Sequence, residues 1–241
     1  MLESLKEQVF KANLELVKYN LVIFTWGNVS AREGNCVVIK PSGVDYDTMK
    51  ADDMVVLDLD GNKIEGKYNP SSDTPTHLEL YKAFPKIKGI THTHSNYATS
   101  FAQAGKPIEA FGTTHADYFY GDIPVTRYLT KEETEIDYEK NTGKVIIETF
   151  KNKDYMAIPG VLVRSHGVFS WGKDAHNSVH NAVVVEELAK MNYQSLMLSE
   201  VPPLLPQYTL DKHYGRKHGE GAYYGQVGVW WKRKDIIMLI F

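Results

Sequence analysis

Two histidines one residue apart follow a short apolar run in the segment Gly89-Ile90-Thr91-His92-Thr93-His94. In a β-strand alternate side chains point to the same face, so His92 and His94 would present their imidazoles together. Two imidazoles on one face of a rigid strand supply half of a transition-metal site. The same pattern also fits two ordinary residues of a half-exposed strand, so the pair needs further ligands before it indicates a metal.

Further candidate ligands stand in two other segments. Asp73 lies in the turn-rich stretch Pro70-Ser71-Ser72-Asp73-Thr74-Pro75-Thr76-His77, and His166 ends a second apolar run and precedes a glycine. One carboxylate and three imidazoles from three segments suit a divalent cation such as zinc, manganese or cobalt. The composition of such a site does not choose among these metals, because availability decides between them.

Three other histidines admit different interpretations. His176 and His180 stand at i and i+4 on a predicted helix, a spacing that can bind zinc. However, the residues between them lack the glutamate of a His-Glu-x-x-His motif, so the pair is kept only as an alternative site. His77 falls on the helix predicted after the Asp73 turn, where we expect it to pack or to hydrogen-bond rather than to bind a metal.

Two turn-like segments could hold an anion. In Lys40-Pro41-Ser42-Gly43 the small residues would let backbone N–H groups approach an anion, and Lys40 adds positive charge. Ser71 and Ser72 supply hydroxyl and N–H groups near the predicted start of a helix, where a phosphate binds well. A plain turn after a strand is the alternative interpretation of the first segment.

The remaining patterns predict the elements that must position these residues. Apolar residues at helical spacing, together with capping and breaking residues, predict helices over residues 3–19, 77–84, 97–104 and 174–197, the last with Asp174 as N-cap. Short apolar runs predict strands over residues 37–39, 54–59, 63–65, 89–94 and 159–166. Residues 107–117 are expected to be a glycine-bearing loop. The Asp60-Gly61 hairpin signal argues that the sheet is not purely parallel.

Bulk composition narrows the class of protein. A chain of 241 residues, 43% hydrophobic and 24% charged, fits one globular domain with a sizeable core. A formal net charge of −3 gives no electrostatic reason to expect a nucleic-acid or membrane partner. Cys36 is the only cysteine, and neither a secretion signal nor a run of ~18 apolar residues is seen, so we expect a cytoplasmic protein.

Seven segments together resemble one family. They are residues 25–30, 40–44, 70–77, 91–94, 112–118, 165–167 and 222–226. In order and in type these residues are similar to the L-ribulose-5-phosphate 4-epimerases of the class II aldolase/epimerase superfamily. The resemblance runs from Met1 to Gln226, which predicts one domain over residues 1–226. Residues 227–241 depart from the family and are expected to be an extension; a membrane-surface anchor is the less favoured interpretation of it.

The resemblance implies an architecture and a set of partners. It implies a three-layer α/β/α sandwich with a mixed, mostly antiparallel central sheet. It also implies a homotetramer with active sites at subunit interfaces, one divalent metal per subunit with zinc favoured over manganese or cobalt, and a small sugar-phosphate substrate. No nucleic acid and no membrane enter this expectation.

The resemblance also implies roles for residues at matching positions. The metal ligands would be Asp73, His92, His94 and His166. The phosphate would be held by Asn28, Lys40, Ser42, Gly43, Ser71 and Ser72. The proton-transfer pair would be Asp117 and Tyr224, with Tyr224 reaching in from a neighbouring chain. Further positions that the family places near its site are Thr113, Glu139 and His213.

The implied activity is epimerisation at C4, which interconverts L-ribulose 5-phosphate and D-xylulose 5-phosphate in L-arabinose catabolism. The C4 hydrogen is not acidic, so inversion requires cleavage of the C3–C4 bond to an enediolate, whose charge a divalent cation stabilises. Rotation of the released aldehyde before rebonding inverts the centre. A proton donor on each face of the aldehyde is then needed, which suits a tyrosine and an aspartate.

Two other function classes remain open. A fuculose-phosphate-type aldolase of the same superfamily would use the same metal and enediolate, but those enzymes carry a glutamate where this chain has Asp73. The presence of Asp73 together with Asp117 favours epimerisation. A non-catalytic metal-binding or sugar-phosphate-binding module would need neither Asp117 nor Tyr224.

Overall fold

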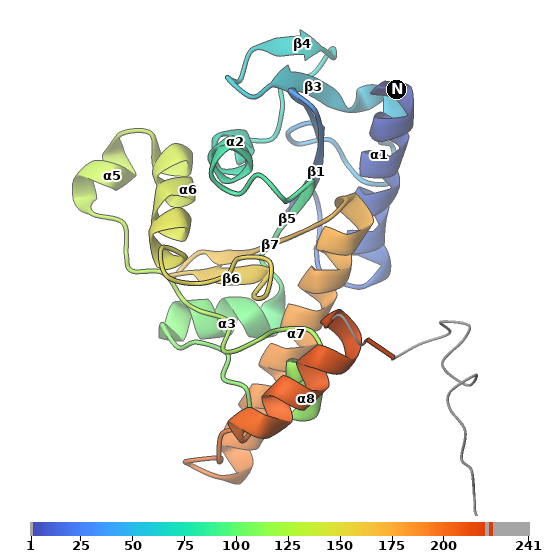
Figure 1. The fold of residues 1–241 in the computed structure, drawn as a ribbon. Helices are drawn as coiled ribbons and strands as arrows, with labels where there is room; N and C mark the ends of the chain where they lie inside the picture. The colour runs from blue at the N-terminus through green and yellow to red at the C-terminus, as the bar shows by residue number, and fades with distance from the viewer. Residues whose placement is uncertain (1, 220–221, 224–241) are drawn as a thin grey trace, which may run out of the picture.

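Seven strands form one sheet in the computed structural model of the chain, which describes residues 2–219 and 222–223 (Figure 1). The strands are β1 (Asn28–Glu33), β2 (Cys36–Ile39), β3 (Val55–Asp58), β4 (Lys63–Glu65), β5 (Gly89–Thr93), β6 (Gly160–Val163) and β7 (Gly167–Gly172). Their spatial order is β4-β3-β2-β1-β5-β7-β6, and each neighbouring pair is antiparallel. A single parallel bridge joins Val125 to Leu162 on β6.

Helices cover both faces of this sheet. They are α1 (Leu2–Lys18), α2 (Thr74–Ala83), α3 (Asn96–Ala104), α4 (Thr113–Ala116), α5 (Lys131–Glu135), α6 (Tyr138–Thr149), α7 (Ala175–Leu198) and α8 (Gln207–His218), with a 3-10 turn η1 (Ala51–Asp53) before β3. Figure 1 shows α2 and α6 on one side of the sheet and α1 and α7 on the other. The predicted three-layer α/β/α fold with a mostly antiparallel sheet is therefore confirmed.

Alternating strand residues feed two hydrophobic cores. Val37 on β2 packs in the core that also contains residues of α2 and α6, whereas Val38 packs against α1 and the first half of α7. Period-two alternation of side chains explains how neighbouring residues reach opposite layers. Among the described residues, no helix combines the length and the hydrophobicity that crossing a membrane would require.

Most predicted elements are confirmed, and two are corrected. Asp174 caps α7 by accepting a hydrogen bond from the Asn177 N–H at 2.7 Å. The strand predicted to run to His166 is wrong, because β6 ends at Val163 and a turn precedes β7. The stretch expected to be a loop over residues 107–117 contains the short helix α4. The predicted extension over residues 227–241 lies outside the described residues.

The strand β5 is enclosed on every side. It pairs with β1 and β7, and its five residues are all buried. The segment that follows is fixed to α7, because the Glu186 carboxylate accepts hydrogen bonds from the Tyr97 and Ala98 N–H groups at 2.8 and 2.9 Å. Ser95, the N-cap of α3, makes no side-chain capping bond, so Glu186 satisfies these helix-terminal donors instead.

Gly89 is the point at which β5 meets the start of α7. A Cβ at this position would lie 2.1 Å from the Asp174 carbonyl oxygen and 2.6 Å from the Ala175 nitrogen. Since both are backbone atoms, the strand and the helix would have to separate.

We expect Gly89→Ala to lower the free energy of unfolding by at least about 3 kcal/mol, because overpacking against rigid backbone is poorly relieved. Denaturant titration monitored by circular dichroism measures the change. Gly112→Ala is the matched control, because among the described residues, its chain neighbours aside, no atom lies within 4 Å of a Cβ built there. It should stay within about 0.5 kcal/mol of the natural sequence. Equal stabilities for the two variants would contradict this account of the β5–α7 junction.

Candidate active site

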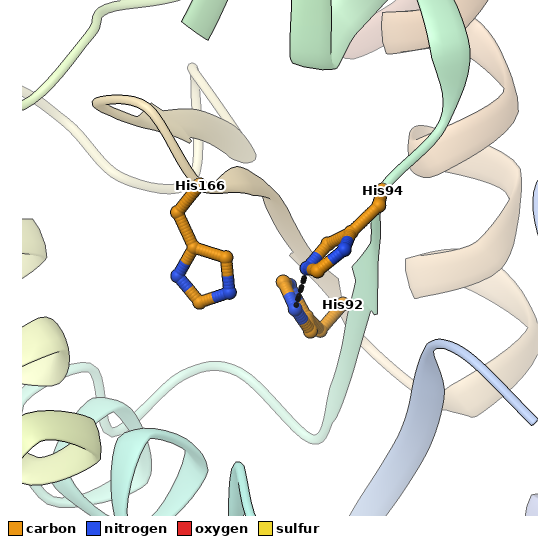
Figure 2. A group of neighbouring side chains, drawn as sticks. All are labelled: His92, His94 and His166. Carbon is orange, nitrogen blue, oxygen red and sulfur yellow. Dashed lines mark hydrogen bonds between the residues drawn. The ribbon is translucent and has the colours of Figure 1, made fainter. Parts of the chain in front are cut away.

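Three histidines from two segments converge at one end of β5. His92 lies on β5, His94 directly follows it, and His166 lies in the turn between β6 and β7 (Figure 2). Their ring centroids are 4.9 to 5.0 Å apart, and one nitrogen of each lies within 4.8 Å of the others. Within the described part of the chain, these three histidines form the group whose ligand atoms lie close enough together to hold a metal ion.

The ring nitrogens are arranged for a cation. His92 Nδ1 lies 2.9 Å from the Val168 carbonyl oxygen and donates to it, which leaves the Nε2 lone pair for a metal. That Nε2 stands 3.1 Å from His94 Nε2. Two lone pairs at this distance repel unless a proton or a cation lies between them. The donor set therefore fits a divalent metal.

Burial also favours the neutral, metal-binding form of two of these histidines, His94 and His166. Burial, with the neighbouring His92 and His94, lowers the pKa of His166 to about 4. Burial likewise lowers the pKa of His94, with a contribution from His92. A metal ligand must offer a lone pair, so neutral imidazoles near pH 7 favour binding.

Asp73 lies beside this group. Its Oδ2 is 3.9 Å from His92 Nε2 and accepts a hydrogen bond from Asn28 Nδ2 at 2.7 Å. Although Asp73 is the N-cap residue of α2, its side chain makes no capping bond and turns toward the histidines instead. Burial pushes its pKa upward, but His92, His77 and the Asn28 bond together hold the pKa below its ordinary value. An ionised carboxylate therefore stands next to the tight group of three imidazoles.

One cavity of about 600 Å³ contains the histidines and Asp73. The residues with a predicted phosphate-binding role line the same cavity; they are Asn28, Lys40, Ser42, Gly43, Ser71 and Ser72. Glu139 lines it as well. The Asn28 side-chain oxygen Oδ1 is buried and has no hydrogen-bond partner among the described residues. This acceptor is available for a hydroxyl group of a ligand.

The two anion-type loops of the cavity are joined through their backbones. The Ser42 N–H donates to the Asn69 carbonyl, and the Ser71 N–H donates to the Lys40 carbonyl, both at 3.0 Å. The Lys40 ammonium donates to the Val44 carbonyl at 3.0 Å and is buried, which lowers its pKa to about 8. Lys40 thus fastens the loop that carries Ser42 while adding positive charge beside the cavity.

Gly167 makes room for the histidines. A Cβ there would lie 2.6 Å from His94 Cδ2, 2.6 Å from the Thr93 carbonyl oxygen and 3.3 Å from His92 Cε1. A larger residue would push both rings out of place. The glycine that follows His166 in the sequence is therefore required by the packing of the other two histidines.

Three other predicted site residues lie apart from this cavity. Asp117, Thr113 and His213 are not among its lining residues. The Asp117 carboxylate instead receives hydrogen bonds from α8: His213 Nδ1 at 3.1 Å and Arg216 Nε and Nη2 at 3.0 and 2.7 Å. Burial raises the pKa of Asp117, but these bonds and the Lys217 charge outweigh it and lower that pKa. Tyr224 lies outside the described residues.

Among the described residues, no third potential metal ligand joins the alternative pair, His176 and His180. His176 Nδ1 pairs with Glu15 Oε1 at 2.9 Å, and the His180 ring lies against the Tyr118 ring at a centroid distance of 5.4 Å. Neither joins a group of three potential ligands in the part of the chain that the structure describes. His77 is fully buried and its Nδ1 bonds the Ser30 hydroxyl at 2.7 Å, as expected of a structural residue.

Two aromatic residues of the cavity were not predicted as site residues. Trp26 lines it with its ring centroid 6.3 Å from that of His94. Tyr138, the first residue of α6, lines it with its hydroxyl 3.3 Å from His166 Nδ1. An aromatic residue in a turn or at a helix start carries no sequence signal of such a role, although Tyr138 directly precedes Glu139 and Trp26 lies two residues before Asn28.

Replacing both strand histidines, His92→Ala/His94→Ala, should abolish tight divalent binding while the fold survives, because two of the three converging nitrogens are lost. Elemental analysis after dialysis measures the bound metal, and circular dichroism monitors the fold. The control His176→Ala should keep the full metal content of the natural sequence. A full equivalent retained by the double variant would refute the assignment, and loss of metal from the control would favour the helix pair.

Comparison with known proteins agrees with this geometry. Residues 7–193 match the family model of the Class II Aldolase and Adducin N-terminal domain. A solved L-fuculose 1-phosphate aldolase is 28% identical over 88% of this chain and 95% of its own, with a TM-score of 0.75.

More distant structures share the fold. An L-fuculose 1-phosphate aldolase from Glaciozyma antarctica is 18% identical over 91% of this chain and 84% of its own, with a TM-score of 0.73. YgbL from Klebsiella pneumoniae, described as a putative aldolase/epimerase/decarboxylase, is 20% identical over 88% and 98%, with a TM-score of 0.70. The family match spans most of the sequence, and the chain belongs to the class II aldolase and adducin family.

Proposed function

We propose that this protein is a metal-dependent L-ribulose-5-phosphate 4-epimerase that interconverts L-ribulose 5-phosphate and D-xylulose 5-phosphate by cleaving and reforming the C3–C4 bond. The observation that carries the proposal is one cavity of about 600 Å³ that holds three imidazoles, a carboxylate and two anion-type loops. A metal next to a phosphate site suits a small sugar phosphate. The compartment proposed for this activity is the cytoplasm.

Asp73, His92, His94 and His166 would hold the metal of the proposed site. Class II aldolases use a divalent metal, usually zinc, and imidazole with carboxylate suits zinc, manganese or cobalt. When bound, the cation stabilises the negative charge that develops on the C2 and C3 oxygens as the C3–C4 bond breaks.

The phosphate group is assigned to the two joined loops. The Ser42 and Ser71 loops lie side by side because their backbones exchange hydrogen bonds, and Lys40 adds charge where they meet. A phosphate fixed there would hold the cleaved aldehyde fragment while it rotates. In epimerisation the aldehyde fragment rotates and rebonds in the site, whereas its release would give net cleavage.

Proton transfer is assigned to Asp117 and Tyr224. The hydrogen bonds from Arg216 and His213 favour the ionised form of Asp117, so it begins as the base that takes the C4 hydroxyl proton when the bond breaks. Tyr224 then donates a proton to the aldehyde oxygen from the opposite face as the bond reforms. In the reverse direction the two groups exchange roles.

The position of Asp117 supports active sites that are shared between chains. Within one chain Asp117 bonds to α8 and does not line the histidine cavity. A second copy that presents its Asp117 and Tyr224 to this cavity would complete the set, in keeping with the proposed homotetramer. The same second copy would also bring its Thr113 and His213 to the cavity.

A second candidate function is a sugar-phosphate aldolase. The observation that favours it is the 28% identity to a protein named L-fuculose 1-phosphate aldolase. The aldolases carry a glutamate at the position of Asp73 and use it as their base. Here the shorter carboxylate is bound by Asn28 and lies against His92, which suits a metal ligand better than a mobile base.

The deciding experiment incubates the purified protein with zinc, manganese or cobalt and L-ribulose 5-phosphate and follows D-xylulose 5-phosphate. L-Fuculose 1-phosphate is offered in parallel, and release of dihydroxyacetone phosphate is followed. Faster epimerisation supports the proposal. Faster cleavage of the fuculose phosphate supports the aldolase, and turnover of neither substrate contradicts both.

Asp117→Asn and Tyr224→Phe should each keep the metal but lose on the order of 10²–10⁴ in kcat, because each removes one positioned proton carrier. Steady-state kinetics with metal analysis measures this. Asp211→Asn is the control, because it alters another carboxylate, on α8 itself, that has no assigned role, and it should retain activity. Near-normal kcat in either test variant removes that residue from the mechanism.

Mixing inactive chains tests whether sites are shared. His92→Ala/His94→Ala chains reassembled with Asp117→Asn chains should regain part of the natural activity, because some interfaces would combine an intact cavity with an intact Asp117. If each chain carried a complete site, no mixture would recover activity.

A further inference from the structure

Tyr138 connects the two walls of the cavity. It is half-buried at the start of α6, and its hydroxyl lies 3.3 Å from His166 Nδ1. The rings of Tyr138 and His166 are tilted at 32°, with centroids 6.0 Å apart. The tyrosine thus reaches from the α2–α6 helical layer to a candidate ligand in the turn that joins two strands of the sheet.

His166 needs such an anchor more than His92 does. His92 sits within β5, and its Nδ1 is fixed by the Val168 carbonyl of β7 at 2.9 Å. His166 instead lies in the turn between β6 and β7, after Ser165, whose φ of 59° is unusual for a residue other than glycine. Tyr138 is the hydrogen-bond partner of His166 Nδ1 among the described residues.

Tyr138 is itself held in place. The Thr142 hydroxyl donates to the Tyr138 carbonyl at 3.0 Å, and the Thr76 hydroxyl on α2 donates to the Glu139 carbonyl. Gly143 allows α6 to approach α2 closely, because a Cβ there would lie 2.7 Å from Glu79 Cβ. The first turn of α6 is therefore fixed to the helix that begins directly after Asp73.

The tautomer of His166 follows from this contact. If the phenol oxygen of Tyr138 accepts the Nδ1–H of His166, the proton is on Nδ1 and the lone pair is on Nε2. Figure 2 shows a ring nitrogen of His166 directed toward His92 and His94. A ligand whose second nitrogen donates a hydrogen bond is oriented and made more basic for a metal.

We propose that Tyr138 is a positioning residue for His166: its phenol oxygen accepts the Nδ1–H, fixes the tautomer and holds the Nε2 lone pair toward the other two histidines. The inference rests on the metal site of the proposed function. In this role Tyr138 affects the affinity and the coordination geometry of the metal, which a residue that only packs would not do.

The test compares Tyr138→Phe with Tyr128→Phe. The second variant is a matched control, because the Tyr128 hydroxyl lies 3.4 Å from the Ser165 hydroxyl in the same turn but does not line the cavity. Zinc affinity is measured by competition with a chromophoric chelator. We expect Tyr138→Phe to bind zinc about 10- to 100-fold more weakly than the natural sequence, and Tyr128→Phe to bind it equally well.

Two further measurements separate positioning from packing. The metal-free melting temperature of Tyr138→Phe should match that of the natural sequence, while the visible absorption of its cobalt(II) form should change because a ligand is misoriented. In a His166→Ala background, Tyr138→Phe should have no additional effect on zinc affinity, since the two residues act as one unit.

The outcomes distinguish the two proposals. Natural-sequence protein that binds zinc, together with Tyr138→Phe that binds it as tightly and with the same cobalt spectrum, overturns this inference alone. An additive loss of affinity in the His166→Ala background also overturns it. Natural-sequence protein without measurable zinc or cobalt binding overturns the proposed metal site and this inference together.

Discussion

The register of β5 between β1 and β7 is the constraint on which the site depends. His92 stands opposite Asn28 on β1 and opposite Phe169 on β7. Directly opposed residues of antiparallel strands share a face, so Asn28 and His92 necessarily point the same way. A slip of β5 by one residue would turn His92 to the other face of the sheet, away from Asn28. Burial of all five residues of β5 makes such a slip costly.

This geometry is arranged for a ligand rather than for stability. The Asn28 amide nitrogen donates hydrogen bonds to Ser71 and Asp73, while its buried side-chain oxygen has no partner among the described residues. Gathering three imidazoles and a carboxylate in one cavity costs desolvation free energy that a packed apolar core would not. Buried polar groups without hydrogen-bond partners are unfavourable for stability, and they are expected where function requires them.

Local signals in the sequence predicted a large part of the fold and of the site. The His-x-His alternation placed two imidazoles on one face, and Asp174 marked the start of α7, because both depend on a few neighbouring residues. The strand β7 was missed because it is buried on both faces and so shows no alternation of apolar and polar residues. The helix α8 was missed because Leu210 is its single buried residue and no apolar stripe results.

Contacts between distant segments could not be predicted from the sequence in the same way. The hydroxyl of Tyr138 meets His166 only because α6 packs on α2, and Lys40 donates to carbonyls only because its loop folds back over it. The proposed role of Asp117 comes from the resemblance alone, whereas the metal role of the histidines also follows from their spacing. In the structure Asp117 does not line the histidine cavity.

The separation of these two groups has a physical consequence. The histidine cavity is built on the sheet, whereas Asp117 is held by α8 through Arg216 and His213. Within one chain Asp117 does not line the histidine cavity, and each group is held by its own hydrogen bonds. If both act on one substrate, a surface of another chain must bring them together, and then assembly itself becomes a condition for proton transfer. With the roles proposed above, metal binding would need the residues of one chain, whereas proton transfer would need those of two.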